Sequence, residues 1–137
     1  MVDREVVLLR LERLKGYIKF LKLVRKLGLK RFKDDPFVHG AAERNLHLSI
    51  ECLLDIGNHV ISDRKLRKPE TYGEIFDVLA EEGIISKTLL RRLDGMAAFR
   101  NLLVHDYVRL DLDHVYGITG KKLKDIEALA KIYSRLL

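Results

Sequence analysis

The chain has 137 residues, with 26 Lys and Arg against 20 Asp and Glu, a net charge of +6, and 47% of its residues are hydrophobic. These values exclude a disordered chain and a membrane-embedded one, and the length predicts one domain over residues 1–137. The single cysteine, Cys52, excludes an internal disulfide and a cysteine-based zinc site. No stretch approaches the roughly 20 apolar residues that span a bilayer, and the first residues lack the core of an export signal. We therefore expect a soluble, cytoplasmic protein with no membrane contact.

Apolar residues recur at helical spacing along the first half of the chain. A first helix is predicted to end at Gly28, which can adopt the left-handed cap conformation at low cost. A second helix is predicted to begin at Pro36 with Asp35 as its cap. It is apolar on most sides between residues 41 and 61, so we expect it at the centre of the molecule. The stripe of the first helix consists of Val7, Leu11, Leu14, Ile18 and Leu21.

The second half of the chain continues the helical pattern. Thr71 and Glu74 have the spacing of a capping box, which predicts a third helix that Gly83 ends. Ser86 is predicted to cap a fourth helix, and a fifth is predicted over about residues 111–135. Short connections between such helices predict an all-α, up-down bundle of about five helices. The stripe of the fourth helix consists of Leu89, Leu93, Met96, Arg100 and Leu103.

Arg100 is the anomaly of that apolar stripe, because a buried guanidinium must find an anion, a polar network or water. Asn101, His105 and Tyr107 follow it within about two helical turns. These residue types suit RNA cleavage by the substrate's own 2′-hydroxyl. Histidine moves a proton near neutral pH, and arginine stabilises the charge that builds up on the phosphoryl oxygens. Asn101 can position the scissile group.

Helical geometry limits this hypothesis, because Arg100 and His105 lie about 140° apart on an ideal helix. They converge only if the helix bends or ends near Val104, or if a second chain completes the site. The alternative is a helix end with an ordinary surface histidine and a snorkelling arginine.

Residues 100–107, RNLLVHDY, resemble the R-X4-H-X-Y signature of the HEPN-domain ribonucleases, and more closely the HepT-like toxins of toxin–antitoxin pairs. The resemblance extends over nearly the whole chain. It includes DIGNHVI at residues 55–61, TYGEIF at 71–76, Leu79 with GII at 83–85, and residues 96–107.

The resemblance implies a helical bundle that forms a homodimer, with the R-X4-H segments of two chains in a shared cleft. The implied activity is metal-independent cleavage of mRNA or tRNA by Arg100 and His105, with Asn101 as the polar residue beside them and no cofactor. The implied partner is a minimal nucleotidyltransferase (MNT) antitoxin that can attach AMP to Tyr107. The alternative is a non-catalytic helical module that docks the nucleotidyltransferase.

Acidic and histidine side chains recur every four residues on the second predicted helix. Steps of four drift by about 40° each, so the outermost members diverge too far for one metal site. We therefore favour a polar ridge over a metal-bound bundle, with no metal ligand assigned. Asp55 or His59, with Asp106 beside the motif, is a candidate to support the cleft. The ridge consists of Glu43, His47, Glu51, Asp55 and His59.

Basic residues are concentrated in two places, and both can attract a phosphate backbone. Residues 10–33 hold ten basic residues and one acidic one, and the second cluster lies at residues 64–68. A solvated helix face, or a surface that docks an acidic antitoxin, is an equally good interpretation.

Overall fold

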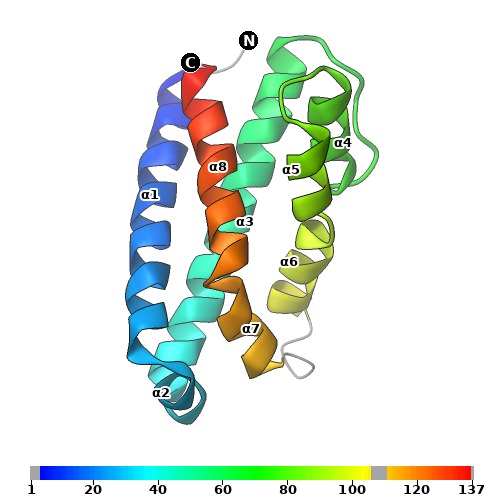
Figure 1. Ribbon diagram of the computed structural model, residues 1–137. Helices are drawn as coiled ribbons and strands as arrows, with labels where there is room; N and C mark the ends of the chain where they lie inside the picture. The colour runs from blue at the N-terminus through cyan, green and yellow to red at the C-terminus, as the bar shows by residue number, and fades with distance from the viewer. Residues whose placement is uncertain (1–3, 106–110, 137) are drawn as a thin grey trace.

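The computed structural model describes residues 4–105 and 111–136, and within these ranges the chain is all helical, without a strand. The predicted all-α class is confirmed. Three long helices run along the molecule, and shorter ones stack beside them or close one end (Figure 1). The long helices are α1 (Arg4–Leu27), α3 (Pro36–Asp63) and α8 (Lys121–Arg135). The short ones are α2 (Leu29–Asp34), α4 (Glu74–Glu81), α5 (Lys87–Arg92), α6 (Met96–His105) and α7 (Leu112–Ile118).

The described residues form eight helical segments because breaks divide the expected helices. Gly28, with φ 89°, separates α1 from α2, and Gly95, with φ 79°, separates α5 from α6. The left-handed region is open to glycine at little cost, so the chain changes direction there. The last predicted helix is divided at Thr119 and Gly120. A Cβ at Gly120 would lie 2.9 Å from Cζ of Arg25, so the break also admits the arginine of α1.

Helix α3 is the centre of the bundle, as its apolar surface predicted. It contacts α1, α2, α4, α6 and α8. Its start is the predicted one, since the Asp35 carboxylate accepts the Phe37 N–H at 3.0 Å and Pro36 occupies the first turn. Its packing against α8 is close, because the buried Tyr133 hydroxyl donates to the Leu53 carbonyl at 2.8 Å. A Cβ at Gly57 would lie 2.8 Å from that hydroxyl, so only glycine fits there.

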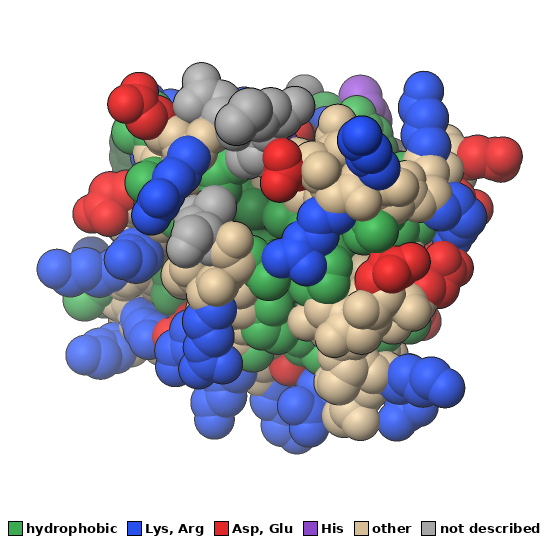
Figure 2. All heavy atoms as spheres, turned by 90° about the horizontal axis from the view of Figure 1, so that it is seen from above, with side chains coloured by type: hydrophobic (Ala, Val, Ile, Leu, Met, Phe, Trp, Pro, Cys, Tyr) green, Lys and Arg blue, Asp and Glu red, His purple; other side chains and the backbone are tan. Residues whose placement is uncertain are grey.

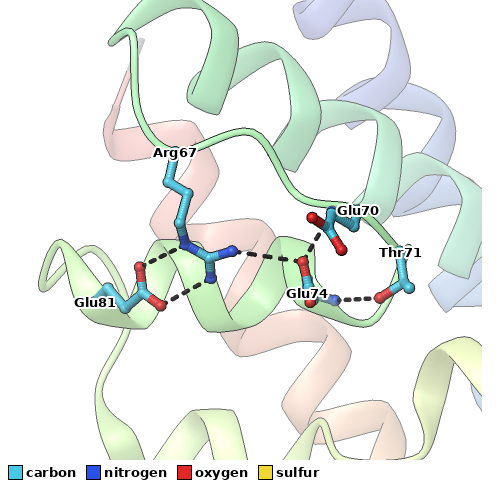
Figure 3. A network of polar contacts seen from close by, with 5 residues as sticks. All are labelled: Arg67, Glu70, Thr71, Glu74 and Glu81. Atoms are coloured by element: carbon cyan, nitrogen blue, oxygen red, sulfur yellow. Dashed lines mark hydrogen bonds and ion pairs between the residues drawn. The ribbon is translucent and has the colours of Figure 1, made fainter.

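The loop between α3 and α4 is held by charged groups. The Arg67 guanidinium bonds both carboxylate oxygens of Glu81, at 3.2 and 2.8 Å, and also reaches Glu74 (Figure 3). The Thr71 hydroxyl accepts the Glu74 N–H at 3.3 Å, as the capping box predicts. Glu74 reaches back to the Glu70 N–H at 2.8 Å instead of to Thr71, so the reciprocal bond falls one residue earlier than expected.

The short helices that carry the candidate motif follow this loop. Ser86 caps α5 as predicted, because its hydroxyl accepts the Leu89 N–H at 3.0 Å. Gly83, with φ 72°, follows α4 at the expected place. Phe99 and Leu103 of α6 are buried in the core, and this fixes how α6 lies on α3.

Candidate functional site

Arg100 lies on α6 beside the core, and its side chain is only 16% exposed. Its guanidinium pairs with the Glu51 carboxylate of α3 through both Nε and Nη2. Its third nitrogen, Nη1, donates to the Asn101 amide oxygen at 3.0 Å. The expectation that this arginine must find an anion is confirmed, and the anion is a carboxylate from the central helix.

Two further groups surround this pair. Cζ of Arg100 lies 5.4 Å from the ring centroid of the half-exposed Tyr72, at a distance suited to a cation–π contact. His47 lies one turn before Glu51, with Nε2 3.4 Å from the carboxylate, and Nδ1 of His47 is 3.2 Å from the Arg44 guanidinium. A series of polar contacts therefore runs along α3 from Arg44 through His47 to Glu51 and from there to Arg100 of α6.

Glu51 is the residue that the sequence analysis did not assign to the site. The ridge pattern contained it, but periodicity alone does not say which ridge member meets Arg100. The useful signal was the need of a buried guanidinium for an anion, combined with the prediction that the second helix is central.

His105 is the last residue of α6, and its side chain is exposed. Helix α6 continues unbroken through Val104 to His105, so an early helix end does not bring the pair together within one chain. Asn101 contacts Arg100 directly, as its placement beside the arginine suggested. Asp106 and Tyr107 lie outside the described residues.

Asp55 and His59 have their described partner on α1 and not on α6. Nε of Arg10 lies 3.5 Å from the Asp55 carboxylate, and Nη1 of Arg10 lies 3.5 Å from Nε2 of His59. The ridge is therefore divided: Glu51 meets α6, while Asp55 and His59 meet α1. A role for Asp55 and His59 in supporting the cleft stays a prediction.

The ridge does not gather into a metal centre within residues 4–105 and 111–136, where no group of three or more His, Cys, Asp or Glu could hold a metal ion. Glu43, at the start of the ridge, pairs with His39 at 3.5 Å. In the same ranges no helix has the length and apolarity that crossing a bilayer requires.

Lys and Arg side chains crowd the left margin of the molecule when it is seen from above, which is the side on which α1 lies in Figure 1, and others lie along the lower margin (Figure 2). Part of this charge holds the bundle together. Lys22 pairs with Glu127 of α8 at 3.0 Å, and Lys33 pairs with Asp113 of α7 at 3.2 Å. The guanidinium of Arg25 lies over the Tyr116 ring at 4.9 Å. The basic stretch is thus partly structural, because three of its cations are engaged with α7 and α8.

Comparison with known families gives one match over most of the chain. The model of the family described as ribonuclease HepT-like matches residues 11–132. The mRNA nuclease HepT of Shewanella oneidensis is 30% identical over 123 residues, which are 90% of this chain and 92% of that protein. The tRNA nuclease HepT of Aphanizomenon flos-aquae is 27% identical over 84% of this chain and 78% of that protein.

Solved structures agree with the sequence comparison. A tri-AMPylated HEPN toxin of Shewanella oneidensis in complex with an MNT antitoxin aligns with a TM-score of 0.87 and 29% identity, over 98% of this chain and 99% of that one. A toxin–antitoxin crystal structure with AMP-PNP aligns with a TM-score of 0.85 and 28% identity, over 97% and 99% of the two chains.

Proposed function

The chain belongs to the HepT-like ribonuclease family, and we propose that it is the endoribonuclease toxin of a toxin–antitoxin module that cleaves RNA without a metal ion. The observation that carries this proposal is the state of Arg100. The arginine of the R-X4-H segment is nearly buried, held by Glu51 and Asn101, and five residues before an exposed histidine. A guanidinium fixed in this way is preorganised for a phosphoryl group.

The proposed reaction needs only groups of the protein and the RNA. His105 takes the proton of a 2′-hydroxyl, and the 2′-oxygen attacks the adjacent phosphorus. The bond to the 5′-oxygen breaks, and that oxygen takes up the proton that the His105 imidazolium now carries, so the histidine returns to its neutral form. The products are a 2′,3′-cyclic phosphate and a 5′-hydroxyl. Arg100 stabilises the negative charge on the phosphoryl oxygens, and Asn101 positions the group.

The site requires a second copy of the chain. Because α6 is helical from Met96 to His105, ideal helix geometry sets Arg100 and His105 about 140° apart around its axis within one chain. A homodimer that apposes two α6 helices brings the arginine of one copy toward the histidine of the other. Two copies then form one cleft that binds the RNA strand.

The proposed partner is a nucleotidyltransferase antitoxin of the MNT type. One relative of known structure is an AMPylated HEPN toxin in complex with such a protein. The motif tyrosine here is Tyr107, two residues after His105. An AMP group on its hydroxyl would add negative charge and bulk beside the cleft and thereby repel RNA.

The test is RNA cleavage in EDTA by the wild type and by Arg100→Ala and His105→Ala. We expect the wild type to cut and both variants to lose at least about a hundredfold in rate, because each removes one part of the chemistry. His114→Ala is the matched control, since His114 is also an exposed histidine, packed on Phe99 outside the motif. Equal cleavage by the wild type and His105→Ala overturns the assignment. An inactive wild type that binds the nucleotidyltransferase would instead identify a non-catalytic docking module.

A further inference from the structure

We propose that a groove beside the ridge is a second phosphate-binding site, which takes a backbone phosphate of the RNA strand that Arg100 and His105 cut. This proposal rests on the proposed function. The groove has a volume of about 550 Å³ and lies between α1, the last turns of α3 and the loop that follows α3. The groups in it that can bind phosphate come from Arg10, Asn58, His59, Ser62, Lys65 and Lys68.

The charge of this groove selects for an anion. Arg10, Lys65 and Lys68 contribute three positive charges, against the single carboxylate of Asp55, which lies 3.5 Å from Nε of Arg10. An ammonium or guanidinium group beside an amide and a hydroxyl is what a phosphodiester needs, because it offers charge and hydrogen-bond donors together.

A second groove on the same molecule provides the contrast. It has a volume of about 670 Å³ and lies between α4, α5 and α6. Its charged residues are Glu74, Asp77 and Asp94, against the single cation Arg91. A polyanion is repelled by this acidic groove and attracted by the basic one, so the larger volume does not decide where RNA binds.

Lys65 stands where the backbone favours glycine. Its φ is 55°, in the left-handed region, and it is the only non-glycine residue with positive φ among the described residues. Its N–H bonds the Ser62 carbonyl at 3.2 Å, and the Leu66 N–H bonds the Ile61 carbonyl at 2.9 Å. These two bonds form a Schellman motif, whose left-handed position is usually glycine. A lysine in the left-handed region destabilises the folded backbone relative to glycine. The role of Lys65 in the groove accounts for its presence, because glycine would supply no ammonium group there.

The rest of the loop is preformed. Arg67 is held by Glu81 and Glu74, as Figure 3 shows, so it stiffens the loop between Lys65 and Lys68. Because the loop is held before RNA arrives, binding does not require it to be ordered at that moment.

The groove and the candidate active site lie at two ends of the same ridge on α3. Gly57 packs against Tyr133 of α8, and Asp55, two residues earlier, lies about 160° around the helix from it. The ridge of Glu51, Asp55 and His59 therefore faces away from α8, with Arg100 at one end and Arg10 beside the other. Eight residues of helix separate Glu51 from His59, which is about 12 Å. One RNA strand can follow the ridge from Arg100 to the groove.

The test measures RNA binding apart from RNA cleavage. Binding of a short fluorescent single-stranded RNA is followed by anisotropy in a His105→Ala background, so that the probe is not cut. The groove variant is Lys65→Gly with Lys68→Gln, in which Lys65→Gly also relieves the backbone cost and thus keeps the fold. The matched control is Lys121→Gln with Lys124→Gln, two exposed lysines of α8.

We expect the groove variant to bind RNA at least about fivefold more weakly at low salt, and its salt slope to fall by about 1.4, or 0.7 for each removed charge. The control pair should change both quantities much less, and Lys65→Arg should retain binding.

Unchanged affinity and slope in the groove variant overturn this proposal while leaving the ribonuclease assignment intact. Equal losses in both pairs also overturn it, because they indicate diffuse attraction. Loss of antitoxin binding with intact RNA binding would show a protein-docking surface instead. A wild type that binds RNA but does not cleave it counts against the proposed function and not against the groove.

Discussion

The guanidinium of Arg100 meets the carboxylate of Glu51 across the contact between α6 and α3, although 49 residues separate them along the chain. The pair has two opposite effects on an incoming phosphate. The Glu51 carboxylate holds the guanidinium of Arg100 in one orientation. Its negative charge also repels the phosphate that the arginine is to bind.

Glu51→Gln separates these two effects. We expect kcat for RNA cleavage to fall about tenfold, because the arginine is less well fixed, and KM to fall, because one negative charge beside the cleft is removed. Steady-state cleavage of a labelled RNA measures both constants. His47→Gln is the control, since His47 contacts Glu51 but not Arg100. A variant with unchanged kcat and KM would show that Glu51 serves only the fold.

Gly57 and Tyr133 should be energetically coupled. Gly57→Ala places a methyl group 2.7 Å from Cγ2 of Ile75 and 2.8 Å from the Tyr133 hydroxyl, so we expect a loss of about 2 kcal/mol in the free energy of unfolding. Tyr133→Phe removes the hydrogen bond to the Leu53 carbonyl and should cost about 1–2 kcal/mol. Urea unfolding of both single variants and the double variant gives the coupling. The double variant should lose less than the sum, because the absent hydroxyl makes room for the methyl group; strict additivity would contradict the packing described here.

Cys52 should react slowly with thiol reagents. Burial, and secondarily the negative charge of Asp55, raises the pKa of its thiol to about 11. At pH 8 the reactive thiolate is then roughly a thousandth of the population, against a few tenths for a free cysteine with a pKa near 8.5. The measurement is the rate of reaction with a disulfide dye in native buffer, with the urea-unfolded protein as the control. Equal rates in the two states would contradict the buried thiol.

Arg67→Ala should change the titration of Glu81. Hydrogen bonding from the Arg67 guanidinium lowers the pKa of the Glu81 carboxyl below its usual range. Because the folded pKa is the lower one, the stabilisation is present above the unfolded pKa and is lost as the pH falls through the folded pKa. NMR titration of the side-chain carboxyl should show the pKa of Glu81 returning toward its ordinary value in Arg67→Ala, whereas Arg64→Ala should leave it unchanged. A Glu81 titration that is the same in wild type and Arg67→Ala would exclude the pair in solution.

The elements that the sequence predicted best are those with local physical causes. Asp35, Ser86 and Gly83 act at helix ends as expected, because capping depends on a few neighbouring residues. The breaks at Gly95 and Gly120 were not predicted. A single glycine is compatible with a continuous helix. At Gly95 the break coincides with a left-handed φ of 79°, and at Gly120 with the close approach of Arg25 of α1, and neither feature can be read from helical periodicity.

The candidate site also has a part that the sequence predicts and a part that depends on packing. The need of Arg100 for an anion follows from burial, but its partner depends on how α6 crosses α3, and helical periodicity does not encode that crossing. His105 lies exposed at the end of α6, and its approach to Arg100 through a second copy of the chain stays a prediction. The family itself is confirmed because the resemblance covers nearly the whole sequence.

Gly57 of α3, where a Cβ would clash with Ile75 and Tyr133, has a consequence for the polar side of that helix. If α3 slid along its axis by one turn, Asp55 would stand where Glu51 now meets Arg100, and its shorter side chain would hold the guanidinium further back. The close packing of Ile75 and Tyr133 against Gly57 opposes such a slide. Leu53 and Ile61, one turn away on either side of Gly57, carry side chains too large for the space that the glycine leaves. The missing Cβ at Gly57 on the apolar side therefore contributes to keeping Glu51, and not Asp55, opposite the arginine on the polar side.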